Sequence, residues 1–161
     1  MSFDKETLKE LLSSAEGLEP AELLPQIDGI LTVLQKVCRI AVLVGPVILL
    51  VMGLLYLLLP AREANYYYGY RTWFGMGSEQ AWKYTQRIAG ALLGLLGLIL
   101  TPVMYFIGIG FASMDAYAAA WKAVRCLLWE AGLVLLATLA INLMVTAMFN
   151  SRGIPRRKKK T

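Results

Sequence analysis

The sequence predicts an all-α integral membrane protein, a three-helix bundle with a cytoplasmic motif loop and an N-terminal amphipathic helical arm. Two observations support this: the chain has three long runs without a charged residue, and a polar, aromatic segment separates the first two runs. The alternative is a soluble bundle, but its helices usually keep a polar stripe at the helical period. These runs are apolar on every side, which favours the membrane class.

Residues 1–35 are predicted to form an acidic amphipathic arm of one or two short helices. Leucine and isoleucine recur at a spacing of three to four residues among seven acids and only two lysines. Pro20 and Pro25 interrupt this pattern, and Pro20 suits the first turn of a second helix. The arm either docks a partner or forms a weakly ordered segment before the membrane, because an acidic face gains nothing from anionic lipid.

Residues 36–150 are predicted to form the membrane domain. Its charge-free runs contain 20, 26 and 20 residues, and a spanning helix needs roughly 20 mainly apolar residues. Three segments cannot close a barrel, and backbone groups in lipid must be paired internally, so every span is expected to be helical. The predicted spans lie at about residues 38–60, 86–111 and 126–149.

The second span carries Gly90 and Gly94, which are spaced as Gly-x-x-x-Gly. Small residues at this spacing let another helix approach closely. With three helices in one chain, we expect this contact to form inside the bundle. A homo-oligomer is the alternative use.

Glu130 is predicted to lie about one turn inside the third span, where an ionised carboxylate is costly unless it faces protein, water or headgroups. One interpretation is an intramembrane acid that binds a substrate or a coupling ion. The other is a residue near the membrane interface, beside Trp121 and Trp129, that pairs with a neighbouring basic side chain.

The lysine and arginine counts predict the orientation of the chain. The loop at 61–87 and the tail at 151–161 together hold ten basic residues, against six on the opposite side. The positive-inside rule then predicts a multi-pass cell-membrane protein with the N-terminus outside and the loop and C-terminus in the cytoplasm.

The tail at 151–161 is polybasic, and each charge near an anionic leaflet is worth about 1 kcal/mol. We expect the tail to bind anionic lipids of the bilayer. Nucleic acid or an acidic protein are the other partners that such a charge run suits.

The composition offers little for metal or covalent chemistry. The chain has no histidine and two cysteines, Cys38 and Cys126. We therefore expect no metal site of the histidine or cysteine type, no cofactor and no histidine-dependent triad. The two cysteines are expected to be independent apolar thiols, with a disulfide as the alternative. No pairing of a nucleophile with a base is recognisable, so an enzyme is not expected.

The segment at 61–87 is polar and rich in aromatic residues. Its tyrosines and tryptophans by themselves suggest an aromatic belt at the membrane interface. Arg71 adds a planar guanidinium between Tyr70 and Thr72, which suits the bidentate capture of a carboxylate or phosphate. Specificity is therefore expected in this segment.

A helix is predicted to begin after Ser78 and to continue into the second span. Ser78 is a suitable N-cap, and Glu79 lies at the positive start of the helix, one turn before Lys83. Trp82 and Gln86 would share one face of this helix.

This loop resembles the signature loop of the SdpI family of bacterial membrane proteins, and the resemblance extends over roughly residues 40–150 in the order of spans. It looks like the C-terminal three-span half of the longer family members. The resemblance rests on an Asn, a Gly-Tyr-Arg-Thr core, a Ser-Glu pair, and a Trp followed by an amide. These residues are Asn65, Gly69, Tyr70, Arg71, Thr72, Ser78, Glu79, Trp82 and Gln86.

The resemblance implies immunity to a secreted killing peptide, and sensing in which a transcriptional repressor is held at the membrane. The partners implied are a hydrophobic peptide toxin and a cytoplasmic regulator. In this hypothesis Arg71 and Thr72 hold the loop or grip an acidic partner, and Trp82 packs the loop at the interface. Asn65 and Gln86 then satisfy its backbone groups.

Two other classes of function stay open. A small transporter would use Glu130 as a proton-coupled carboxylate and would need several copies to build a pathway. A structural subunit of a larger membrane complex would use the glycine-rich second span and the acidic arm.

Overall fold

The structure is a computed structural model that describes residues 20–60 and 67–156, with side chains from residue 29 onwards. This part of the chain is all-α, and each of its three long helices is long and apolar enough to cross a membrane. The predicted all-α class and its three candidate membrane spans are confirmed for these residues. The elements are α2 (Pro20–Leu58), η1 (Gly75–Gly77), α3 (Glu79–Ile109), η2 (Gly110–Ser113) and α4 (Ala116–Met148).

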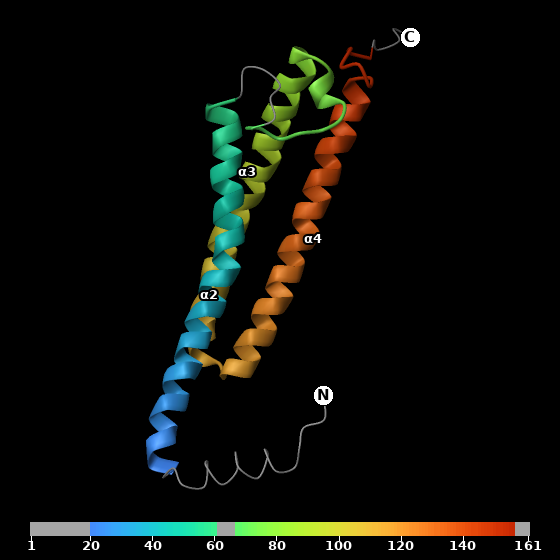
Figure 1. Ribbon diagram of the computed structural model, residues 1–161. Coiled ribbons are helices and arrows are strands. Elements are labelled where there is room, and N and C mark those ends of the chain that lie inside the picture. Colours follow the sequence, from blue (N-terminus) through green and yellow to red (C-terminus); the bar gives the residue numbers. More distant parts are fainter. Residues whose placement is uncertain (1–19, 61–66, 157–161) are drawn as a thin grey trace, which may run out of the picture.

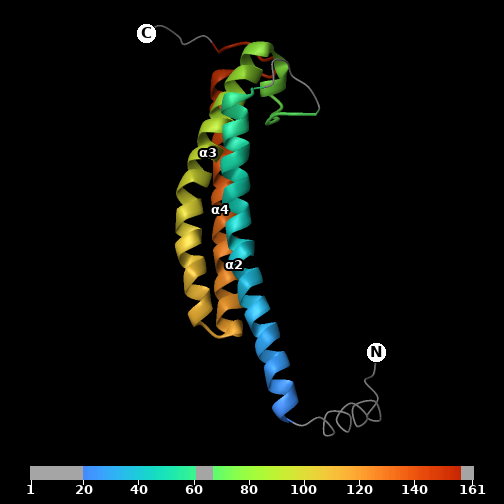
Figure 2. The same ribbon diagram turned by 90° about the vertical axis from the view of Figure 1, so that its left-hand side faces the viewer.

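Helices α2 and α3 lie along each other, and α4 lies beside this pair (Figure 1). The loop before α3 and the turn after α4 lie at one end of the bundle, as an arrangement of three consecutive spans requires. The short η2 connection lies at the opposite end, where Gln35 Nε2 donates a hydrogen bond of 2.6 Å to the Met114 carbonyl. The N-terminal part of α2 projects beyond the other two helices (Figure 2).

The structure corrects the predicted arm. Residues 20–35 do not form a separate short helix, because α2 runs through them into the first span without a break. Pro20 is the first residue of α2, a position where the missing N–H removes no helix hydrogen bond. Pro25 removes only one helix hydrogen bond, and α2 continues through it. Residues 1–19 of the predicted arm lie outside the described part.

Glycines set the close contact between α2 and α3. A Cβ added at Gly53 would overlap the backbone of Gly94 and lie 3.0 Å from the Gly90 carbonyl oxygen, and one added at Gly97 would overlap the backbone of Leu50. Backbones that approach so closely gain van der Waals contact that lipid cannot replace. This confirms that the Gly-x-x-x-Gly pair is used inside the bundle.

Two buried clusters join α4 to the other helices, one towards each end of the bundle. Between Ala123 and Ile141, Glu130 is the single buried residue of α4, a helix that the structure describes in full. Both cysteines are free, and both belong to the cluster near η2. That cluster is centred on Cys38, Val42, Leu100, Met104, Phe111, Ala119 and Ala123. The cluster near the loop is centred on Tyr56, Ala81, Ala89, Leu93, Ile141, Val145 and Phe149.

The substitution Gly53→Ala tests the contact between α2 and α3. It places a methyl group against the α3 backbone, so we expect the protein to lose about 1–3 kcal/mol of stability. Thermal unfolding of the purified protein in mild detergent measures this loss. Gly132→Ala is the control, because a Cβ there meets nothing within 4 Å. Equal melting temperatures for the two variants would contradict the role of Gly53 in the close contact between α2 and α3.

Candidate functional site

The described part of the motif loop, residues 67–78, folds against the first turns of α3. Gly69 has a φ of 113°, in the region that side chains rarely adopt. A Cβ there would lie 2.7 Å from the Trp82 ring and 2.9 Å from Gln86 Oε1. Glycine is therefore needed at this position both for the backbone conformation and for the close approach of the loop to α3.

Gln86 binds the loop backbone through two hydrogen bonds. The Tyr70 N–H donates to Gln86 Oε1 at 2.9 Å, and Gln86 Nε2 donates to the Tyr70 carbonyl at 2.8 Å. The Gln86 side chain is 0 % exposed, and a buried amide that lost these partners would keep the full penalty of desolvation. The expectation that Gln86 satisfies backbone groups of the loop is confirmed.

Thr72 closes the turn that leads into η1. Its hydroxyl accepts the Gly75 N–H at 2.8 Å, and its carbonyl accepts the Met76 N–H at 3.1 Å. A Cβ at Gly75 would lie between the hydroxyls of Thr72 and Thr85, so a larger residue does not fit there. Thr72 therefore holds the loop conformation, which is one of the two roles that the immunity hypothesis gave it.

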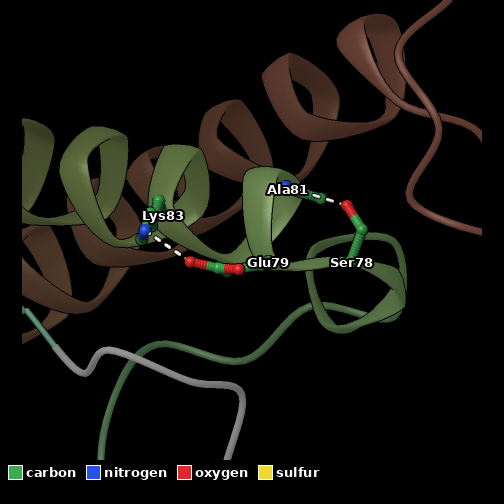
Figure 3. A network of polar contacts seen from close by, with 4 residues as sticks. All are labelled: Ser78, Glu79, Ala81 and Lys83. Carbon is green, nitrogen blue, oxygen red and sulfur yellow. Dashed lines mark hydrogen bonds and ion pairs between the residues drawn. The ribbon is translucent and has the colours of Figure 1, made fainter.

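Ser78 caps α3 and also contacts the end of the chain. Its hydroxyl oxygen accepts the Ala81 N–H at 3.1 Å, which is the predicted N-cap (Figure 3). The same hydroxyl donates to the Gly153 carbonyl at 2.6 Å. Glu79 and Lys83 form the predicted ion pair, which is exposed. An exposed pair of this kind contributes little to stability, so the cap is the more important contact.

A tight turn after α4 presents the Gly153 carbonyl to Ser78. Asn150 Oδ1 accepts the N–H groups of Arg152 and Ile154 at 3.0 and 2.9 Å. Gly153 has a φ of 69°, and a Cβ there would lie 2.8 Å from the Ser78 Cβ. The turn thus attaches the C-terminal segment to the motif loop.

The exposed residues of the loop differ in character from the buried ones. Trp82, Gln86 and Thr72 are buried, whereas Arg71 is exposed. Tyr67 is 97 % and Trp73 82 % exposed on the same short segment. The buried residues hold the backbone in place, and the exposed ones form a basic and aromatic surface, which we call the Arg71 surface.

Tyr70 is partly buried, so its exposure is intermediate between that of the buried loop residues and that of the Arg71 surface. Burial, and to a smaller extent the neighbouring Tyr56, raises the pKa of the Tyr70 phenol. The phenol therefore stays neutral at physiological pH, and Arg71 carries the charge in this part of the loop.

The structure brings most of the predicted motif residues together, with two exceptions. Asn65 lies outside the described residues, and Glu130 lies near the middle of α4, away from the loop. The predicted span began at about residue 126, whereas α4 begins at Ala116, where Asp115 caps it by accepting the Ala118 N–H at 2.9 Å. The helix therefore starts well before the apolar run from which the span was predicted.

Two residues of the site were not found from the sequence. Thr85 lies three positions after Trp82 on the same face of α3, a spacing that could have indicated it. Gly153 contacts Ser78 across 75 positions of the chain, and no local pattern signals that contact. In the described ranges no three His, Cys, Asp or Glu residues are grouped as a metal site would require.

Comparison with known proteins identifies the family. A sequence model of the SdpI/YfhL protein family matches residues 62–149, more than half of the chain. The chain belongs to the SdpI/YfhL family. The match covers the motif loop, α3 and α4, whereas α2 precedes it, so it begins later in the chain than the resemblance predicted.

A curated relative of this SdpI/YfhL chain is the uncharacterized protein YfhL of Bacillus subtilis (strain 168), with 32 % identity over 66 residues. The aligned part is 41 % of this chain and 60 % of that relative, so the chain spans less than two thirds of the relative's length. No solved structure matches the chain.

The substitution Gln86→Ala tests the attachment of the loop to α3. It leaves the Tyr70 N–H and carbonyl without their partners, so we expect the loop to open more easily by about 1–3 kcal/mol. The rate of trypsin cleavage after Arg71 in the purified protein measures the opening. Gln80→Ala, at an exposed position of the same helix, is the control. Identical cleavage rates for both variants would contradict the role of Gln86.

Proposed function

We propose that this protein is a bacterial membrane immunity and sensor protein of the SdpI type. It recognises a hydrophobic killing peptide at the membrane and relays a signal through the motif loop. Membership of the SdpI/YfhL family supports this proposal. The observation that carries it is the construction of the loop, in which buried motif residues hold the backbone and leave Arg71 exposed.

A loop held in this way is suited to binding. Two hydrogen bonds from Gln86 and the Thr72 turn order the backbone before any partner arrives, so little conformational entropy is lost on association. The Arg71 guanidinium offers a fork of donors that matches a carboxylate or phosphate. The Arg71 surface is therefore proposed to bind an acidic group of the peptide or of a cytoplasmic regulator.

The orientation is part of this proposal, with the Arg71 surface in the cytoplasm. This orientation follows from the excess of basic residues at the end of the bundle that carries the loop and the tail.

A cysteine-accessibility experiment tests the orientation. In a background without the native cysteines, Gln80→Cys and Ser113→Cys place single thiols at exposed positions at the two ends of the bundle. We expect a membrane-impermeant maleimide on intact cells to label the thiol at position 113 and to leave the one at position 80 unlabelled. The reverse pattern would place the loop outside the cell.

The substitution Arg71→Ala tests the function of the loop. We expect it to reduce survival of a sensitive bacterium, challenged with the peptide that an SdpI immunity protein resists, to the level of cells without the protein. Removal of the guanidinium eliminates the charged donors while the contacts of Gln86 and Thr72 stay in place. Survival is compared at matched protein abundance in the membrane.

Arg87→Ala is the matched control, since it removes an exposed arginine of α3 that is not part of the Arg71 surface. It is expected to protect cells as the wild type does. Full protection by Arg71→Ala would reject the role of the Arg71 surface. Failure of the wild type to protect would reject immunity to that peptide.

A further inference from the structure

A cavity of about 540 Å³, open along one side, lies between α2 and α4. It is separate from the motif loop, and we call it the α2–α4 cavity. Apolar side chains form most of its wall, among them Ile48 and Leu49 of α2 and Leu127 and Val134 of α4. The polar exceptions are the carboxyl group of Glu130 and Thr138, whose hydroxyl donates to the Leu135 carbonyl at 2.8 Å. The volume of the cavity lies within the range of small-molecule sites, roughly 300–1,000 Å³.

The Glu130 carboxyl is buried without a full set of partners. Its side chain is 6 % exposed, and Oε1 accepts no hydrogen bond from the described residues. One interpretation of the sequence paired Glu130 with a neighbouring basic side chain, but the structure shows other contacts for Arg125 and Lys122. Arg125 Nε donates to the Trp121 carbonyl at 3.5 Å, and Lys122 Nζ lies 6.0 Å from the centroid of the Phe111 ring.

Gly45 makes room for this carboxyl on the opposite helix. A Cβ at Gly45 would lie 2.8 Å from Glu130 Oε2, so a larger residue would push the carboxyl out of its place. The carboxyl therefore packs against the α2 backbone while Oε1 lacks a donor. An acid in this position at the depth of the apolar runs is costly unless a donor reaches it.

A second copy of the chain carries no basic residue within its charge-free runs. Gly45 and Glu130 face each other, and Gly45 lies inside the first charge-free run, Ile40–Leu59. The other two runs are equally free of lysine and arginine, so a basic side chain of a second copy would have to reach the carboxyl from outside these runs. A lipid acyl chain would fill the space and still leave Oε1 unpaired.

We propose that the α2–α4 cavity binds a membrane-soluble lipophilic amine. The apolar body of the ligand fills the space between Ile48, Leu49 and Val134, and its ammonium group donates a hydrogen bond to Glu130 Oε1. A charge-assisted hydrogen bond of this kind is about twice as strong as a neutral one. The lining selects ligands that already partition into the bilayer, and the carboxyl selects those with a cationic head.

Photolabelling with a defined probe tests this proposal. The probe is decylamine with a diazirine in its chain, and the matched neutral probe is the corresponding decanol, each applied to the full chain in phosphatidylcholine nanodiscs. We expect the amine probe to label the cavity residues of α2 and α4, and unlabelled decylamine to compete with it. Glu130→Gln should lower amine labelling at least about tenfold and leave the weaker alcohol labelling unchanged.

A pair of glycine variants separates binding from folding. Gly45→Ala should reduce amine labelling because it displaces the carboxyl, whereas Gly132→Ala, where a Cβ meets nothing within 4 Å, should not. Circular dichroism and elution volume report whether each variant is folded.

Three outcomes would overturn the proposal. Equal amine labelling of the wild type and Glu130→Gln would remove the carboxyl from recognition. Equal labelling by the amine and the alcohol would indicate that lipid chains fill the cavity. If neither probe labels the wild-type protein and cavity residues of two copies can be cross-linked to each other, this face is the interface of a dimer. None of these outcomes depends on whether the protein confers immunity.

Discussion

The close contact of α2 and α3 at Gly53 and Gly94 is the constraint on which the other features depend. Lipid is as apolar as the helices, so burial of apolar surface does not drive them together. Close backbone approach does, and it requires glycine at the contact, where a Cβ would overlap the facing backbone. The rigid pair that results places the end of α2 beside the start of α3 and so determines where the motif loop begins.

The motif loop extends this rigid pair beyond the apolar runs. Trp82 and Gln86 continue the buried face of α3 past the point where charges begin, and the loop packs on them through Gly69. Ser78 then connects the loop to the turn after α4. One end of the bundle is thus a connected polar structure that joins the motif loop, α3 and the turn after α4, and the Arg71 side chain lies exposed at its surface.

Helix α4 is attached differently, through two clusters at its ends rather than a glycine contact along its length. The interval between the clusters holds Glu130, buried but incompletely hydrogen-bonded, beside a cavity. A protein that only needed stability would place an apolar residue there, because an unpaired buried carboxyl is destabilising. The loop end and the middle of the bundle therefore offer two chemically distinct places for recognition, one exposed and basic, the other buried and acidic.

The sequence by itself determined the features that depend on local composition. Charge-free runs must become helices in lipid because every backbone group needs an internal partner, and Ser78 before Glu79 predicts where α3 begins. Only the tertiary structure decided which distant groups meet. Gln86 with the Tyr70 backbone, Ser78 with the Gly153 carbonyl, and Glu130 with Gly45 are pairings across many residues, and they depend on how the helices pack, which local sequence patterns do not encode.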